Sequence, residues 1–244
     1  MLQKNNYRKL LNTCLAGVLG ITVCGAPLLA IAQEYHPPKR GIPGRREGAG
    51  TRGTCLRGPK LLMPLAPSDS FSTTVSTTPT FFWYVPKTIA QTAEFALLDE
   101  NDRTLYRTTV NLPGAPGVVG VSLPANVTNT VLTVGKDFYW QFSILCDPTQ
   151  PSINPFVEGV VQRVKPATAL VNQLKKAPQR ERSSLYASNG IWQDAIATLA
   201  QERCAKPQDQ SVIDGWSKLL QSVQLEDYAQ APLLQTCPAK ATVK

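Results

Sequence analysis

The chain has 244 residues, and 43% of them are hydrophobic, so it can form a substantial core. Its formal net charge is +8, and the basic excess is local to the N-terminal part. The single histidine, His36, lies in an N-terminal stretch that we expect to be mobile, which disfavours His-based catalytic triads and most zinc sites.

Residues 1–32 have the composition of a secretory signal peptide. Three basic residues precede an apolar run, which ends in the small residues of a cleavage site. The basic residues are Lys4, Arg8 and Lys9. We expect cleavage after Ala32, export of a chain that begins at Gln33, and no stable transmembrane segment thereafter. The alternative is an uncleaved anchor, which Gly25 and Pro27 disfavour because they interrupt the apolar run.

Four cysteines remain after cleavage: Cys55, Cys146, Cys204 and Cys237. An even number in an exported chain, without the C-x-x-C spacing of zinc and redox sites, favours two disulfides. Cys55 and Cys146 flank the β-rich region, and the other two flank a helical region, so we expect these local pairs. The other two possible pairings stay open. Each bridge would contribute roughly 3 to 4 kcal/mol to stability.

Residues 33–59 form a basic arm, rich in proline and glycine and almost without large apolar residues. Such a segment buries too little apolar surface to offset its ordering entropy, so we expect it to be flexible until about Cys55. Its arginines could bind an anionic surface or polysaccharide; the alternative is a solvated leader. The candidates are Arg45, Arg46, Arg52 and Arg57. Nucleic acid is not expected, because no aromatic residues are interleaved for stacking on bases.

Residues 60–165 contain short apolar runs separated by turn residues, which is typical of an antiparallel β-sandwich. In the clearest run, 138–146, alternation places Phe138, Trp140 and Phe142 on one face. We expect an immunoglobulin-like sandwich in which the aromatic strand through Trp83 packs on that face. The expected strands are 61–63, 71–75, 80–85, 92–98, 104–110, 118–123, 138–146 and 156–164.

Residues 166–244 change to helical periodicity and predict a helical hairpin with a third helix, a small layer packed on the sandwich. Pro178 is expected to end one helical stretch, and Gly190 to end a second that begins at Ser183 or Ser184. The spacing of Gly190, Trp192, Ala195 and Leu199 resembles one tetratricopeptide turn, in which glycine lets two helices approach. The expected helical stretches are 170–177, 183–189, 190–199 and 211–223.

No Gly-x-Ser-x-Gly elbow, Walker loop or Rossmann glycine pattern appears at an expected strand-to-helix junction. We therefore expect a non-enzymatic protein without a metal or cofactor. The remote alternative is a hydrolase whose carboxylates meet only in the folded chain, for example Glu94 and Glu158 as a glycosidase pair.

Several stretches are similar to a family of uncharacterised cyanobacterial exported proteins, family 928 of the domains of unknown function. They are residues 44–55, 79–86, 138–147, 159–164 and 186–192, with Pro-Thr-Phe-Phe-Trp-Tyr-Val-Pro at 79–86. The resemblance covers nearly all of the expected mature chain. It implies export to the periplasm, the cell exterior or the thylakoid lumen, and it implies that residues 44–55 belong to the domain. It carries no catalytic residues.

The leading hypothesis is an exported, non-enzymatic interaction protein of the cyanobacterial envelope that binds another exported or envelope protein. The alternative, from another class, is a polysaccharide-binding module that uses the basic arm and exposed aromatic residues. The first rests on export and the helical hairpin, and the second on the arginines of the arm.

Overall fold

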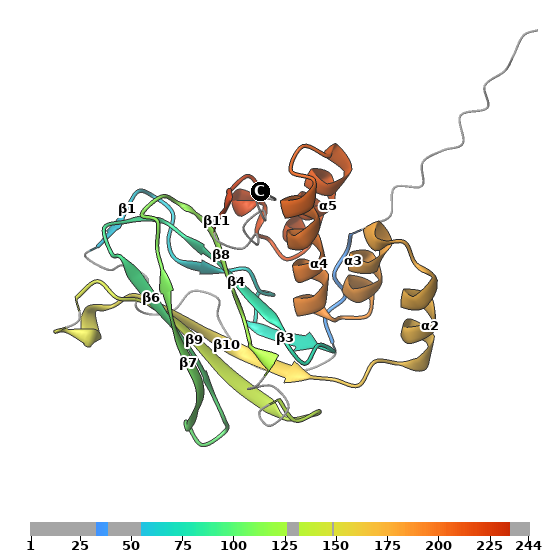
Figure 1. The fold of residues 1–244 in the computed structure, drawn as a ribbon, viewed down its shortest axis with the longest axis horizontal. Coiled ribbons are helices and arrows are strands. Elements are labelled where there is room, and N and C mark those ends of the chain that lie inside the picture. Colours follow the sequence, from blue (N-terminus) through green and yellow to red (C-terminus); the bar gives the residue numbers. More distant parts are fainter. Residues whose placement is uncertain (1–32, 39–54, 126–131, 148, 235–244) are drawn as a thin grey trace, which may run out of the picture. The chain divides into compact units, whose positions relative to one another are not determined.

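The structure is a computed structural model that describes residues 33–38, 55–125, 132–147 and 149–234. The predicted signal peptide, residues 1–32, lies outside the described residues. The described chain is mainly β-structure followed by helices, which agrees with the coarse fold prediction (Figure 1).

Most strands belong to two sheets, one of five strands in the order β3-β10-β9-β6-β7 and one of four in the order β11-β8-β4-β2. The five strands are β3 (Phe71–Thr74), β10 (Phe156–Arg163), β9 (Asp137–Ile144), β6 (Thr92–Leu98) and β7 (Thr104–Asn111). The four strands are β11 (Leu233–Leu234), β8 (Gly117–Ser122), β4 (Thr80–Val85) and β2 (Met63–Pro64). A short separate sheet pairs β1 (Leu56–Arg57) with β5 (Lys87–Thr88).

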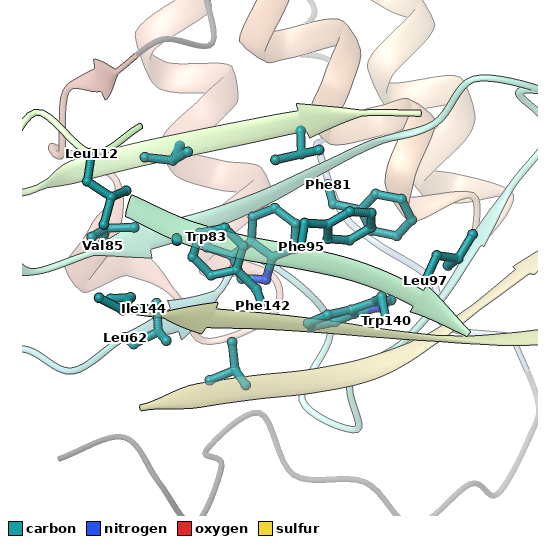
Figure 2. Packing of buried hydrophobic residues seen from close by; sticks show 14 of the residues in the cluster. Leu62, Phe81, Trp83, Val85, Phe95, Leu97, Leu112, Trp140, Phe142 and Ile144 are labelled. Atoms are coloured by element: carbon teal, nitrogen blue, oxygen red, sulfur yellow. The ribbon is translucent and has the colours of Figure 1, made fainter. Parts of the chain in front are cut away.

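The two larger sheets share one apolar cluster, the sheet core, to which Phe81, Trp83, Phe95, Trp140 and Phe142 belong (Figure 2). Trp83 of β4 stacks on Phe142 of β9 with the ring centroids 4.2 Å apart, and it meets Trp140 edge-on at 5.8 Å. The predicted inward face of β9 and its aromatic partner strand are thus confirmed. Paired aromatic rings bury the most apolar area per residue, so this contact dominates the sheet core.

Strand β4 is buried on both faces, because its alternate side chains enter a second cluster. Phe82 and Tyr84 pack with Trp192, Trp216 and other apolar residues of the C-terminal helices, and we call this cluster the helical core. A continuous apolar run such as residues 80–85 is typical of a strand with no solvent-facing side. The helices therefore cover the face of the four-stranded sheet that points away from the sheet core.

The prediction of a wholly antiparallel arrangement is wrong at two edges. β3 pairs with β10 in parallel, and β11 pairs with β8 in parallel. Neither pair is joined by a hairpin turn, and only a short turn forces neighbouring strands to run in opposite directions. Period-two alternation reports which side chains are buried and contains no information on strand direction, so the sequence could not show this.

The described residues contain four α-helices, one at each of the four expected helical stretches, so the description of this layer as a hairpin with a third helix counts one helix too few. They are α2 (Thr168–Lys176), α3 (Gln179–Ser188), α4 (Trp192–Ala205) and α5 (Gln210–Gln221), with short 3-10 turns at Pro151–Ile153 and Glu226–Tyr228. Pro178 separates α2 from α3, as expected, but α3 begins directly after it. Proline is compatible with a helix N-terminus, where its missing N–H would have no partner.

The expectation of a flexible arm does not hold at either end of the arm. Gln33 and Tyr35 are only 8% and 5% exposed, and Tyr35 belongs to the helical core. Near the other end, Cys55 is buried and β1 pairs with β5. The average composition of the arm gave no sign that one aromatic residue, Tyr35, is buried. Full burial of such a side chain contributes about 2 to 3 kcal/mol to the free energy of unfolding.

Candidate functional site

A hollow of about 180 Å³ lies where the connection between β3 and β4 crosses the first turns of α4. We call it the Asp194 cleft. Its lining is dominated by hydroxyl, amide and carboxyl groups. They include Thr74, Thr78, Thr80, Tyr186, Asp194 and Gln201.

Asp194 lies in the first turn of α4, where the partial positive charge of a helix N-terminus favours a carboxylate. Its Oδ2 accepts hydrogen bonds from Thr74 Oγ1 at 2.7 Å and from the Val75 backbone N–H at 3.1 Å. Thr198 Oγ1 donates to the Asp194 backbone carbonyl at 2.7 Å. The carboxyl is therefore held at a defined position and ties the β3–β4 connection to the helix.

Burial raises the pKa of Asp194, and the hydrogen bonds from Thr74 and Val75 offset only part of this effect. Burial also raises the pKa of Tyr186, and the nearby Asp194 carboxylate raises it further. A carboxyl group with a raised pKa beside a phenol in a hollow is a common feature of functional sites. The same combination also occurs where a carboxylate is purely structural. Whether the hollow is a functional site therefore depends on the other groups that line it.

Among the described residues that line the hollow, Asp194 is the one carboxylate and no basic side chain is present. Glycoside hydrolysis needs two carboxyl groups facing one bond, and nucleophilic catalysis needs a nucleophile beside a base. The lining of the Asp194 cleft has one carboxyl group and thus lacks a glycosidase pair, and it contains one hydroxyl–carboxyl contact, that of Thr74 Oγ1 with Asp194 Oδ2. Its groups can instead donate and accept several hydrogen bonds to a neutral ligand.

A second feature of the helical region is an extended segment, residues 33–38, that lies against α3, α4 and α5. The ring of Tyr35 meets Trp192 edge-on, with centroids 5.1 Å apart. The Tyr35 backbone N–H donates to Ser222 Oγ at 3.3 Å, and the His36 N–H donates to the Ala187 carbonyl at 3.1 Å. We call the surface that receives this segment the segment groove.

The walls of the segment groove have small side chains or hydrogen-bonding groups where the segment comes closest. Ser183 Oγ donates to Gln33 Oε1 at 3.1 Å inside the helical core. A Cβ on Gly190 would lie 2.8 Å from the His36 carbonyl oxygen, which is closer than side chains approach. Gly190 has a φ of +73° and ends α3, as the sequence predicted, but the close approach it permits is to this segment rather than between two helices.

A larger hollow, of about 460 Å³, lies between the start of α3 and the end of α4. Pro178, Arg180, Gln201, Glu202 and Lys206 line it, and Gln201 also lines the Asp194 cleft. Burial raises the pKa of Glu202. The charged side chains belong to neighbouring helix turns and do not converge on one point that the structure identifies.

The predicted disulfide between Cys55 and Cys146 is present, with the two Cα atoms 5.4 Å apart. It links the end of the basic arm to the residues that follow β9. Cys204 is also disulfide-bonded, while Cys237, its predicted partner, lies outside the described residues. Both observations agree with a chain in which these cysteines serve as cross-links.

The predicted anionic-surface residues are mostly outside the described part of the chain: this holds for Arg45, Arg46 and Arg52. Arg57 is exposed on β1, and its Nη1 donates to the Leu56 carbonyl at 2.9 Å. Of the aromatic residues, Tyr139 on β9 is 42% exposed, whereas Trp83 and Trp140 are buried. The described residues thus do not gather an aromatic strip beside Arg57.

Glu94 and Glu158 lie on the outer face of the five-stranded sheet, on either side of β9. Their cross-strand partners on β9 are Ser143 and Gln141, so β9 lies between them and their Cα atoms are roughly 12 Å apart. Glu94 is also paired with Arg107, with Nη1 and Oε1 2.5 Å apart. A flat sheet face with an ion-paired carboxylate does not form the enclosed pair that a glycosidase needs.

Two residues that matter most here, Tyr35 and Asp194, were not singled out by sequence reasoning. Tyr35 is a lone aromatic in a polar, proline-rich stretch, and Asp194 occupies a helix position at which acidic residues are common. The amphipathic pattern of 190–199 located the helix correctly. The one available hint was the unusual run of hydroxyl residues at 72–80, which supplies the opposite wall of the Asp194 cleft.

The described helices include none with both the length and the apolar character needed to cross a membrane. In the same residues, no group of three or more histidine, cysteine, aspartate or glutamate side chains is arranged to hold a metal ion.

Fold and site together define a mainly β-protein with a helical layer, a disulfide-linked sheet region and a polar cleft at the sheet–helix junction. Residues 47–233 match the family model described as Domain of Unknown Function (DUF928), and because the match spans most of the sequence, the chain belongs to this family. No curated protein matches the chain.

Proposed function

We propose that the protein is an exported, non-enzymatic interaction protein of the cell envelope whose helical layer binds an extended peptide segment of a partner protein. The observation that carries this proposal is the segment groove. Residues 33–38 lie in it through one buried aromatic anchor and two backbone hydrogen bonds. Extended peptides are bound in this way: main-chain hydrogen bonds supply affinity, and a side-chain pocket supplies specificity.

The segment in the groove belongs to the chain itself, so it competes with any partner. A tethered segment acts at an effective concentration in the millimolar range, which masks the groove from weak external peptides. The proposal therefore needs a partner that binds more tightly than the segment, or a step that releases it. Export is supported by the Cys55–Cys146 disulfide, because disulfides persist in oxidising compartments.

The sheet region is proposed to be immunoglobulin-like. Two features support this assignment: β8 pairs with β4 in one sheet, and β10, β9, β6 and β7 are consecutive neighbours in the other. These correspond to the E–B pair and to the G–F–C–C′ order of variable-type immunoglobulin domains. Such domains commonly present partner-binding surfaces, which agrees with an interaction role without specifying the partner.

The segment groove can be tested by emptying it in the full chain. A Tyr35→Ala variant removes the aromatic anchor, so a labelled peptide with the sequence of residues 33–38 should bind it at least about tenfold more tightly than it binds the wild type. Fluorescence anisotropy measures this difference. The matched control is Tyr139→Ala, which removes an exposed tyrosine elsewhere and should behave like the wild type.

A peptide in which alanine replaces the tyrosine should bind neither protein. Equal binding of the labelled peptide to the wild type and to Tyr35→Ala, with both folded by circular dichroism, would refute the peptide-binding proposal.

A further inference from the structure

The Asp194 cleft is a polar hollow that takes no part in holding residues 33–38 in the segment groove. Its lining offers both kinds of hydrogen-bonding partner. Thr74 and Val75 donate to Asp194 Oδ2, and the backbone N–H groups of Ser76 and Asp194 also interact with the carboxyl. A carboxylate has about four acceptor sites on its two oxygens, so it can accept a further hydrogen bond from a ligand in the hollow. The hydroxyl of Tyr186 and the amide of Gln201 can each donate and accept.

The charge of the lining restricts the class of ligand. An anionic ligand would meet the Asp194 carboxylate, and no lysine or arginine lines the hollow to compensate. Protein sites for Ca²⁺ usually combine several carboxylate and carbonyl oxygens, whereas the described lining supplies one carboxylate and no group of metal-ligating side chains. A neutral ligand that carries many hydroxyl groups matches both the charge and the hydrogen-bonding pattern.

The volume restricts the size of the ligand. At about 180 Å³ the hollow is smaller than sites for drug-sized molecules, which are roughly 300–1,000 Å³. It can therefore hold one small ring rather than an extended ligand. Gln201 also lines the larger hollow beside it, so a ring bound in the cleft could be the end of a longer chain that continues there.

The position of the carboxyl is set before any ligand arrives. Its hydrogen bonds to Thr74 and Val75, and the bond from Thr198 to its backbone carbonyl, fix both ends of the residue. Gln193, which is 4% exposed and also lines the cleft, is fixed by its bond to Ser72 Oγ at 3.1 Å. Preorganised polar groups reduce the entropy cost of binding a small polar ligand.

We propose that the Asp194 cleft is a binding site for a neutral sugar ring, in which the Asp194 carboxyl accepts from ring hydroxyls while Tyr186 and Gln201 complete the hydrogen bonds. The site is separate from the basic arm, and it requires no anionic group on the sugar. The sugar could be free or could be the end of a polysaccharide, and the two sources share this chemistry.

The test titrates the full chain with D-glucose, D-galactose and N-acetyl-D-glucosamine, followed by amide chemical shifts and saturation-transfer NMR. We expect at least one neutral sugar to bind, and D-glucuronate to bind more weakly than D-glucose because of the Asp194 charge. Asp194→Asn should weaken binding by about tenfold or more, since a charged acceptor is lost. The control is Asp214→Asn, the same change at an exposed position of α5, which should leave binding unchanged.

Tyr186→Phe provides a second variant if Asp194→Asn fails to fold, and it should also weaken binding. Tighter binding of a short neutral oligosaccharide than of its terminal monosaccharide would identify a polysaccharide end, and equal binding would identify a free sugar. The proposal is overturned if no neutral sugar in the panel perturbs the cleft residues, if D-glucuronate binds as well as D-glucose, or if neither variant weakens binding. Failure of the peptide test with Tyr35→Ala leaves these outcomes unaffected.

Discussion

The two faces of strand β4 meet different surroundings. Phe81 and Trp83 enter the sheet core, where their neighbours are aromatic and aliphatic side chains. Phe82 and Tyr84 enter the helical core, whose surroundings include buried hydrogen-bonding side chains such as Ser183. One strand thus separates a region held by apolar packing from a region in which polar groups determine how the parts fit together.

The indole groups of Trp83 and Trp192 show this difference, whereas Trp216 Nε1 in the helical core has no hydrogen-bond partner among the described residues, as in the sheet core. Trp83 Nε1 in the sheet core is buried and has no hydrogen-bond partner among the described residues. Trp192 Nε1 in the helical core donates to the Leu65 carbonyl at 2.8 Å. Apolar packing tolerates replacement by side chains of similar shape, whereas a hydrogen bond requires its donor and acceptor at defined positions. This difference supports the proposal that the helical region, rather than the sheet region, recognises other molecules.

The largest expected effect concerns the cross-link of the sheet region. Replacing Cys55 and Cys146 together by alanine opens a loop with a sequence separation of 91 residues. The chain-entropy estimate for a loop of this length gives a loss of roughly 4 to 5 kcal/mol in the free energy of unfolding. Urea titration of both proteins measures it. A loss below about 1 kcal/mol would mean that the sheet region does not depend on its cross-link.

The next prediction compares the two cores by making the same substitution, tryptophan to phenylalanine, in each of them. Trp192→Phe and Trp83→Phe remove the same atoms, but only the first leaves a buried carbonyl, that of Leu65, without its partner. We expect Trp192→Phe to lower the free energy of unfolding by about 1 to 2 kcal/mol more than Trp83→Phe does. Equal losses in urea titration would contradict the distinction between packing and hydrogen bonding.

The smallest expected effect is a pH dependence of the stability, which arises from Asp194 in the helical region. Burial raises the pKa of Asp194 above its ordinary value of 3.8, so the folded chain holds this proton more tightly than the unfolded chain. Its contribution to stability is therefore fully present below the ordinary pKa and declines as the pH rises through the raised pKa. Asp194→Asn should remove this decline, which the difference between wild-type and variant denaturation midpoints would show.

The control for the pH effect is again Asp214→Asn, because Asp214 is exposed. Its midpoints should follow those of the wild type at every pH. A stability difference between wild type and Asp194→Asn that stays constant with pH would mean that this carboxyl keeps the same pKa in both states.

Much of the sheet region could be predicted, because burial of one strand face leaves a period-two pattern in the sequence. The strands at 80–85, 92–98 and 156–163 agree with the expected positions to within one residue. The pairing of Cys55 with Cys146 followed from their positions on either side of this region. The helices were located, but α3 and α4 are each longer than expected, since helix ends depend on packing partners as well as on the local sequence.

The sequence by itself determined which residues are buried in the sheets and where helices replace strands, and it favoured the Cys55–Cys146 pair while leaving two other pairings open. Only the tertiary structure decided the parallel edge pairs, the burial of Tyr35 against Trp192, and the meeting of Thr74 with Asp194. The physical reason is the distance along the chain. Periodicity and capping act within a few residues, whereas these contacts join segments about 90 or more residues apart and are selected by the packing of the whole chain.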